Sequence, residues 1–259
     1  MGIMKTTILL ICSLVLSSPG WSQELSGKHT TSGKINFQER TKLEIKIEGD
    51  AAQFAESLPK EQFSDKVLYF NSDYSLYQND DTNKGEDAMM SHDGQMNVQM
   101  IISGDKVKTF MDLKKNIKVE QKDFMTRMFL IESDMTFNDW KLTGNFKVVL
   151  GYNCQEAVRE DQSKKISAWF TPSIQVSAGP AGFGGLPGLI LHVNIDNGKR
   201  IITAVSADPE FNDIALLVRP KEGRKVTEAE FKQIVDEKMK EMGTENEEGG
   251  AHVIIRIKN

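Results

Sequence analysis

Cysteine is scarce in this chain. Only two cysteines occur among 259 residues, and Cys12 lies in an apolar segment at the start of the chain. If that segment is removed, Cys154 has no intramolecular partner, which excludes a disulfide framework. The folded protein must therefore be stabilised by a hydrophobic core rather than by cross-links.

Long apolar runs and an excess of positive charge are also missing. No 18 consecutive apolar residues occur, so a membrane-spanning helix is not expected. The 32 Lys and Arg residues are outnumbered by 37 Asp and Glu residues, which gives a net charge of −5. Nucleic-acid binding needs a clustered basic field, so nucleic acid is not an expected partner.

Recognisable catalytic signatures are absent from the sequence. There is no H-E-x-x-H zinc helix, G-x-S-x-G nucleophile elbow or phosphate-binding P-loop, and the four histidines are widely scattered. These absences favour a non-enzymatic protein, and neither a cofactor nor a resident metal is predicted.

The first 22 residues have the features of a secretory signal peptide. Lys5 is the only charge, residues 8–16 are mostly apolar, and the small residues Gly20 and Ser22 precede the expected cleavage position. We therefore expect one mature domain over residues 23–259. It would be exported to the periplasm or associated with the outer membrane, without spanning a membrane.

Alternating apolar and polar residues predict a mainly β fold. The period of two is clear at residues 107–113 and 189–195, and Asn197-Gly198 after the second segment is a hairpin signal. No repeat or internal boundary is evident. The sequence predicts a mainly β (α+β) fold, namely a single curved antiparallel sheet or half-barrel.

One C-terminal helix and minor helices complete the expected fold. Thr227 and Glu230 have the spacing of a capping box. Apolar residues follow at helical spacing, at Phe231, Ile234, Val235, Met239 and Met242. A minor helix is expected over residues 51–58, before Pro59.

Residues 178–191 contain five glycines and two prolines. Glycine permits backbone conformations closed to other residues, and proline fixes φ, so this composition prescribes a particular backbone path. The glycines lead into an expected strand rather than into a helix N-terminus. A structural turn or bulge is therefore favoured over a phosphate-binding loop.

The hexapeptide Gly185-Leu186-Pro187-Gly188-Leu189-Ile190 resembles the signature of the GLPGLI family, whose members are exported proteins of gram-negative bacteria without an assigned function. Four further segments resemble that family: Ser75–Tyr77, Gly151–Ala157 with Cys154, Ala168–Pro172 with Trp169, and Gly179-Pro180. The resemblance implies export and a β-rich fold, with these positions as a structural signature. It implies no catalytic residues.

The leading hypothesis is an exported, non-enzymatic binding or accessory protein of the cell envelope. A concave sheet face would hold an apolar small molecule such as a lipid, or an envelope protein. Lipoprotein carriers provide a fold-level analogy for this arrangement, although fold alone does not establish a ligand.

Two alternatives are carried by particular residues. Met89, Met90, His92 and Met96 offer thioether and imidazole ligands that suit Cu(I), although methionines alternating with apolar residues are more typical of a core. Cys154 would be the nucleophile of an enzyme, with His192 as its base, but a lone cysteine in a strand is more typical of packing.

Aromatic residues near the signature have two interpretations. Tyr152, Trp169 and Phe183 could line a ligand cleft, because exposed aromatic clusters are typical of binding sites. Covering the sheet is the preferred interpretation.

Overall fold

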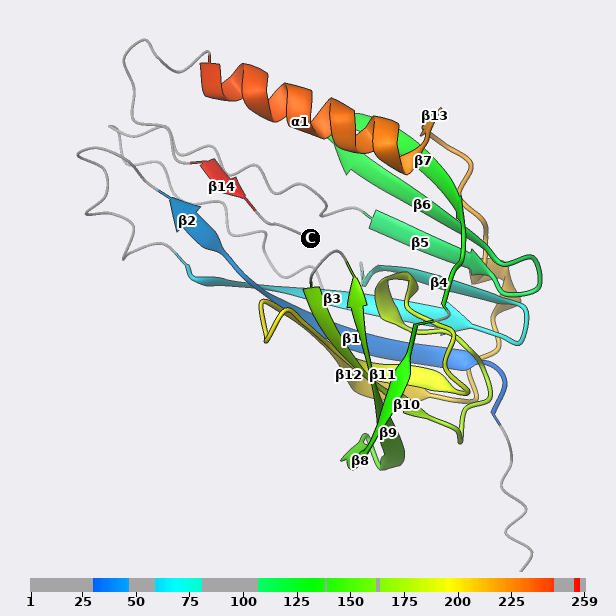
Figure 1. Cartoon of the computed structure of the whole chain (residues 1–259). Helices are drawn as coiled ribbons and strands as arrows, with labels where there is room; N and C mark the ends of the chain where they lie inside the picture. Colours follow the sequence, from blue (N-terminus) through cyan, green and yellow to red (C-terminus); the bar gives the residue numbers. More distant parts are fainter. Residues whose placement is uncertain are drawn as a thin grey trace, which may run out of the picture.

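The protein is built on one large open β-sheet with a single α-helix in the part of the chain that the structure describes. The computed structural model describes residues 30–46, 59–80, 107–137, 139–161, 164–244 and 254–256. Twelve strands form the sheet, in the spatial order β13-β7-β6-β5-β4-β3-β1-β12-β11-β10-β9-β8 (Figure 1). β2 and β14 form a separate pair.

The elements follow one another along the chain in this order: β1 (Gly33–Lys42), β2 (Glu44–Lys46), β3 (Glu61–Phe70), β4 (Tyr74–Asn79), β5 (Val107–Asp112), β6 (Ile117–Phe124), β7 (Arg127–Asp134), β8 (Lys141–Val149), β9 (Tyr152–Asp161), β10 (Lys164–Thr171), η2 (Pro180–Gly182), β11 (Leu189–Ile195), β12 (Arg200–Asp208), η3 (Ile214–Leu216), β13 (Arg224–Val226), α1 (Glu228–Thr244) and β14 (Ile254–Arg256).

The expected curved sheet with one C-terminal helix is confirmed, with one difference in strand direction. Every strand pair of the large sheet is antiparallel except β13 with β7, which is parallel and places Val226 beside Ile131. A parallel neighbour requires a crossover connection. Residues 209–223 provide it by carrying the chain from the middle of the sheet to its β7 edge.

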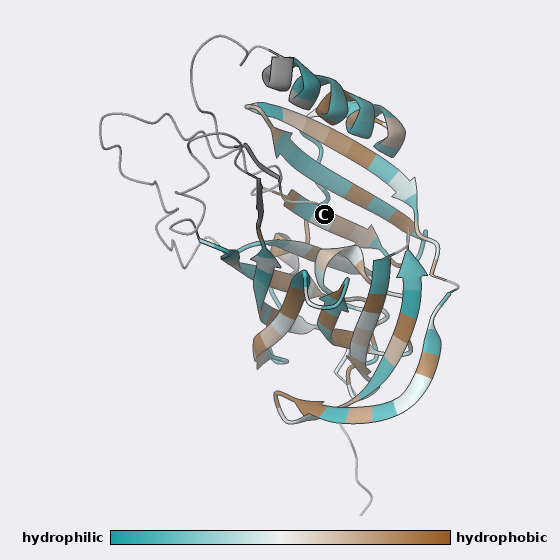
Figure 2. Ribbon diagram, turned by 60° about the vertical axis from the view of Figure 1, so that its left-hand side comes forward, coloured by the Kyte–Doolittle hydropathy of each residue, from teal (hydrophilic) through white to brown (hydrophobic). Residues whose placement is uncertain are grey.

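Figure 2 shows apolar and polar residues alternating along the strands. The alternation arises because successive residues of a strand point to opposite faces. In β1, Ile35 and Phe37 are buried whereas Lys34 and Asn36 are only half-buried. We call the face that carries α1 and the glycine-rich segment the inner face, and the opposite face the outer face.

Local turn and cap signals specify where elements begin and end. The amide of Thr227 donates to Glu230 Oε2 at 2.7 Å, and the amide of Glu230 donates to Thr227 Oγ1 at 3.2 Å, which confirms the capping box. The predicted hairpin at Asn197-Gly198 joins β11 to β12. Its loop is longer than two residues, with positive φ at Asp196, Asn197 and Gly198 (50°, 53° and 89°).

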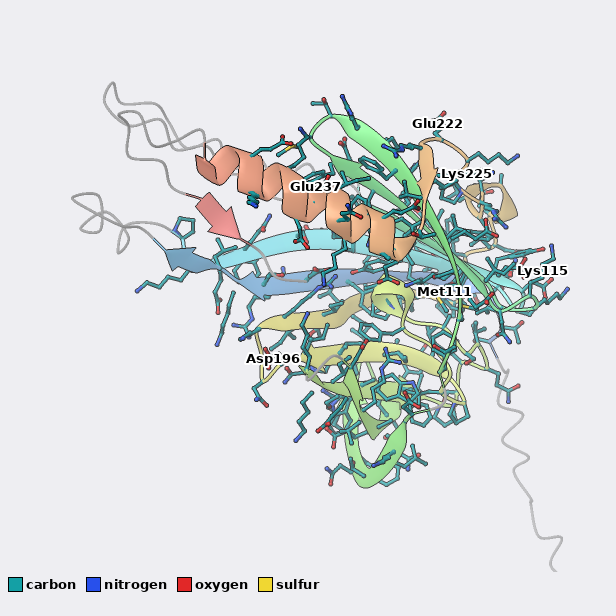
Figure 3. All side chains as sticks on the ribbon, turned by 45° about the horizontal axis from the view of Figure 1, so that its top comes forward. Met111, Lys115, Asp196, Glu222, Lys225 and Glu237 are labelled. Atoms are coloured by element: carbon teal, nitrogen blue, oxygen red, sulfur yellow. The ribbon has the colours of Figure 1, made fainter. Side chains whose placement is uncertain are left out.

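The core has one main cluster and two smaller ones. The main cluster joins β1, β3, β4 and β8–β12 with buried residues of the glycine-rich segment. Met111 lies in the middle of the molecule, whereas Lys115 and Glu222 lie toward its periphery (Figure 3). A separate cluster forms where Phe231, Ile234 and Val235 of α1 pack on β6, β7 and β13.

No helix among the described residues is long and apolar enough to cross a membrane. The helix expected over residues 51–58 and the signal peptide expected over residues 1–22 lie outside the described residues.

Candidate functional site

The glycine-rich signature crosses the inner face and packs into the core. Leu186, Leu189 and Ile190 are buried. The indole Nε1 of Trp140 donates to the carbonyl oxygen of Gly184 at 2.9 Å. The segment contacts other parts of the same chain, which is typical of a structural element.

Three glycines of the structural signature have no space for a side chain. Gly185 has φ +80°, and a Cβ atom there would lie 2.0 Å from Cβ of Phe137. Gly188 has φ +152°, and its Cβ would lie 2.1 Å from the carbonyl oxygen of Thr171. Gly179 precedes the buried Pro180 in an ordinary extended conformation, but its Cβ would lie 2.7 Å from Cβ of Ile190.

An open hollow of about 570 Å³ lies on the outer face of β8–β11. We call it the outer cleft. It is lined by Thr143, Asn145, Lys147, Glu156, Val158, Lys165, Ser167, Trp169, His192, Asn194 and Asn197.

Glu156 is held by three donors from two neighbouring strands. Thr143 Oγ1 donates at 2.8 Å, Asn145 Nδ2 at 2.7 Å and Ser167 Oγ at 2.6 Å. Burial opposes ionisation of this carboxyl, but the hydrogen bonds outweigh it and lower the pKa of Glu156. The result is an ionised carboxylate in a fixed position, with its oxygens already engaged.

Lys147 and Trp169 form one side of the outer cleft. The Lys147 ammonium lies 4.3 Å from the centroid of the Trp169 ring, which is a cation–π contact. Burial lowers the pKa of Lys147, although nearby Cys154 and Glu156 act in the opposite direction. Trp169 is therefore part of a cleft, which differs from the preferred interpretation that it only covers the sheet.

His192 belongs to the outer cleft and is neutral there. Its Nδ1 lies 2.9 Å from Thr203 Oγ1. Burial, and then the charge of Lys147, lower the pKa of His192 to about 4. The neighbouring Asn194 contributes a buried side-chain oxygen that has no hydrogen-bond partner among the described residues.

We expect His192 to stay neutral through mildly acidic pH. Its folded pKa of about 4 lies below the value near 6.5 of an unfolded histidine, so the unfolded chain binds the extra proton between these values. Stability should therefore fall as pH drops from about 6.5 toward 4. Imidazole chemical shifts followed by NMR would measure this pKa. The His192→Asn variant should show a flatter pH dependence of stability, and a pKa near 6.5 would contradict the prediction.

Cys154 lies in the core, beside the cleft rather than open to it. Its side chain is fully buried, and its thiol donates weakly to the carbonyl oxygen of Tyr152 at 3.5 Å. Burial raises the pKa of Cys154 to about 11. Cysteine catalysis needs a lowered thiol pKa and an oriented base. The thiol pKa of Cys154 is not lowered, and the imidazole of His192, the expected base, makes its hydrogen-bond contact with Thr203.

The native Cys154 thiol should react slowly with iodoacetamide. With a pKa of about 11, roughly one thiol in a thousand is ionised at pH 8, and burial hinders access further. In a chain lacking residues 1–22, we expect alkylation to be at least about 100-fold slower in the native state than in urea. Mass spectrometry measures both rates. Rates within a few-fold of each other would show an accessible, activated thiol.

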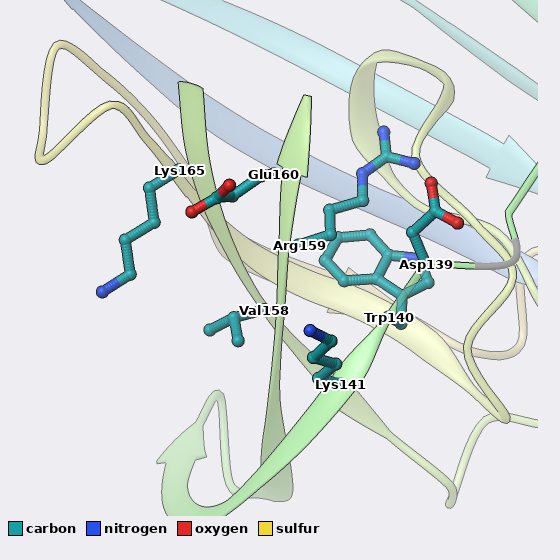
Figure 4. A pocket seen from close by; sticks show the side chains of 7 residues that line it. All are labelled: Asp139, Trp140, Lys141, Val158, Arg159, Glu160 and Lys165. Atoms are coloured by element: carbon teal, nitrogen blue, oxygen red, sulfur yellow. The ribbon is translucent and has the colours of Figure 1, made fainter. Parts of the chain in front are cut away.

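A second hollow of about 620 Å³ adjoins the outer cleft and shares Val158 and Lys165 with it (Figure 4). Arg159 in this hollow stacks over the rings of Trp140 and Phe183, at 4.8 and 5.5 Å from their centroids. These contacts tie β9 to the glycine-rich segment. Phe183 and Tyr152 pack against the core and do not line the outer cleft. For these two residues the structure agrees with the interpretation that they cover the sheet.

The described part of the chain contains no cluster of His, Cys, Asp and Glu side chains suited to metal binding. No group of three or more His, Cys, Asp or Glu side chains within residues 30–46, 59–80, 107–137, 139–161 and 164–244 could hold a metal ion. The copper candidates Met89, Met90, His92 and Met96 lie outside the described residues, so copper binding there stays a prediction.

The inner face carries charges where an apolar face was expected. Arg200 Nε donates to Glu39 Oε1 at 2.7 Å, and Glu39 also accepts from the Tyr77 hydroxyl at 3.4 Å. On β6, Glu120 lies 3.1 Å from Lys118 and 3.4 Å from Lys122. Buried charges are retained only where they are paired, and these pairs make the inner face mixed rather than apolar.

No single sequence signal predicts the outer cleft. Thr143, Asn145, Glu156 and Ser167 are ordinary polar residues of alternating strands. Ser167 of β10 and Lys141 of β8 both pair with Val158 of β9. This register brings the polar residues of the three strands together on one face. That register could be inferred only after the strand order was known.

Comparison with known proteins finds a short match to the model of a family of unassigned function, and a similar fold. Residues 155–192 match the model of a family described as a protein of unknown function (Porph_ging). This segment spans β9 to β11 and includes the glycine-rich segment. The match agrees with the expectation of a family without assigned activity, whereas the resemblance to the GLPGLI family itself stays a prediction. No curated protein matches the chain.

Two solved structures of PNGF-II, in the C2 and P21 space groups, have a similar fold. Each is 20% identical with a TM-score of 0.51, and each match covers 79% of this chain. The matched part is only 32% and 33% of those chains, so this chain spans about a third of their length. At this identity the likeness shows the fold alone.

Proposed function

We propose that this chain is an exported, non-enzymatic binding or accessory protein of the cell envelope, and that the outer cleft binds a polar segment of a partner protein. The observation that carries the proposal is the outer cleft itself. Four neighbouring strands bring amide, hydroxyl, carboxylate and ammonium groups around Trp169 in an open hollow of about 570 Å³. Recognition sites typically combine an aromatic surface with a few fixed polar groups.

Binding fits the electrostatics of this cleft better than catalysis does. A catalytic acid or base needs a pKa near the working pH. Here the pKa of Glu156 is lowered and that of His192 is about 4, so both groups hold one protonation state near neutrality. Fixed charges and fixed donors suit recognition.

Export to the periplasm or the outer membrane is supported by the composition of residues 1–22, with one positive charge before an apolar run. The inner face supports a lipid role less well than the sequence suggested. The glycine-rich segment and α1 already pack on it, and Glu39 and Arg200 bring charge to it.

The test is an NMR screen of the isotope-labelled protein against blocked di- and tripeptides. We expect shifts of the Trp169 indole and of amides near Glu156 and His192, and loss of these shifts in Trp169→Ala. The control variant Phe63→Ser removes an aromatic ring that is 57% exposed on β3, and it should leave binding unchanged. Shifts confined to the inner face would contradict the proposal.

A further inference from the structure

β8 forms one edge of the large sheet in the described part of the chain. Among the described strands it pairs with β9 alone, whereas the strand at the other end, β13, is only three residues long and leads directly into α1. An edge strand presents unpaired N–H and C=O groups, and proteins usually protect it with prolines, lysines, short length or bulges. β8 has nine residues and no proline. A bulge between Leu142 and Phe146 interrupts it, and Lys141 and Lys147 add positive charge.

A row of exposed apolar side chains follows this edge. Leu142, Phe146 and Val148 are 56%, 70% and 65% exposed. They pair with Ala157, Gln155 and Asn153 of β9, which places all three on one face of the strand. Figure 2 shows the alternation of apolar and polar residues along this outermost strand. Single exposed apolar residues are ordinary, but a row of them on an open edge is typical of an interaction site.

The backbone N–H and C=O groups of Phe146 and Val148 are oriented so that an added strand could pair with them. A two-residue turn joins β8 to β9, with φ 51° at Leu150 and 80° at Gly151. Residues that flank such a turn exchange both hydrogen bonds, and the ladder then alternates. Counting back from Val149, the N–H and C=O groups of Phe146 and Val148 therefore point away from β9.

Charge on β8 is of one sign. Lys147 lies on the face opposite the apolar row, as does Lys141 before the bulge, and the strand contains no acidic residue. Lys165 lies nearby in the outer cleft, where Glu156 is occupied by its three donors. Two further carboxylates, Asp139 and Glu160, line the adjoining hollow with Lys141 and Lys165. Acidic side chains on the outer side of an added strand would complement these lysines.

From these observations we infer that β8 binds an extended segment of a partner protein as an added strand, and that this segment alternates apolar with acidic residues. The regular stretch Phe146–Val149 supplies the backbone hydrogen bonds, because the bulge at residues 143–145 interrupts the ladder before it. The inference rests on the binding role proposed above, but it uses the strand edge rather than the floor of the cleft.

A second copy of the chain fits this edge less well. Two β8 strands paired with each other would bring together Lys141 and Lys147 of both copies with no acid on either strand. Like charges in neighbouring strands are destabilising. The occupant is therefore a segment with acidic residues, which β8 itself lacks.

The experiment measures binding of a fluorescein-labelled, blocked peptide of sequence Glu-Val-Glu-Val-Glu-Val-Glu to the purified protein by fluorescence anisotropy. Val148→Pro removes an outward N–H that β9 does not use, and proline is tolerated on edge strands. We expect the Kd to rise by at least about tenfold in this variant, with an unchanged melting temperature. Val148→Ala keeps the N–H and should weaken binding only about two- to threefold.

The remaining comparisons separate the alternatives. A peptide with lysine in place of glutamate, or with N-methyl groups on alternate residues, should bind more weakly. Equal binding by Val148→Pro and the unmodified protein, or no binding of the acidic peptide at 1 mM, would overturn the inference. Binding lost in Trp169→Ala but kept in Val148→Pro would overturn it while leaving the outer cleft as the binding site. A dimer that Val148→Pro dissociates in sedimentation would make a second copy the occupant and also overturn it.

Discussion

Replacing Gly185 with alanine is expected to lower the free energy of unfolding by about 3 to 5 kcal/mol. The methyl group would lie 2.0 Å from Cβ of Phe137, at a backbone φ of +80° that favours glycine. Either Phe137 or the glycine-rich segment must move, and both belong to the packing of the inner face. Urea unfolding followed by circular dichroism would measure the loss.

The matched control is Gly151→Ala. Gly151 has the same φ of +80°, but a Cβ atom there meets nothing within 4 Å. It should therefore lose only the backbone term, about 1 kcal/mol. Gly188→Ala should resemble Gly185→Ala because its Cβ would lie 2.1 Å from a Thr171 backbone oxygen. Equal losses at positions 151 and 185 would show that backbone conformation alone, and not packing, requires these glycines.

Replacing Arg200 with methionine should destabilise the protein by about 2 to 4 kcal/mol. Glu39 is buried, and Arg200 Nε donates to it at 2.7 Å in the middle of the sheet. Without that partner, the buried carboxylate keeps, among the described residues, only the long hydrogen bond from Tyr77, at 3.4 Å. Removing one member of a buried ion pair lowers stability by more than the intact pair contributes, because the remaining charge stays buried without its partner.

A double variant distinguishes this cause from simple loss of packing. Glu39→Met combined with Arg200→Met should recover much of the stability, because no unpaired charge is left. Arg219→Met is the surface control. Its partner Glu132 is half exposed, so the loss should stay below about 0.5 kcal/mol. If the double variant is as unstable as the sum of the single ones, the two residues act independently.

The parts of the fold that depend on local signals could be predicted from the sequence. Strand β11 follows from the alternation at residues 189–195, and α1 begins where Thr227 and Glu230 form their capping box. The C-terminal helix and the mainly β character follow from how these segments are spaced. Local hydrogen bonds and one-sided burial determine such features, and both are visible in a short window of sequence.

Features that depend on distant pairing could not be predicted. The Glu39–Arg200 pair joins residues 161 positions apart, and neither residue has a neighbour in sequence that suggests a buried charge. The donors around Glu156 come from β8 and β10 and are brought together by the register of both strands with β9. The parallel pairing of β13 likewise depends on the crossover through residues 209–223.

The position of β1 in the sheet has a consequence for the order of folding. This strand, the first of the large sheet along the chain, lies between β3 and β12, so Phe37 pairs with Lys66 on one side and with Ala204 on the other. Its second hydrogen-bonded partner does not exist until residues 200–208 have been synthesised. Pairing of such distant segments requires closure of a large loop and is slow. A chain interrupted before residue 200 would therefore expose β1 as a long unprotected edge, and assembly of the central sheet must await nearly the whole polypeptide.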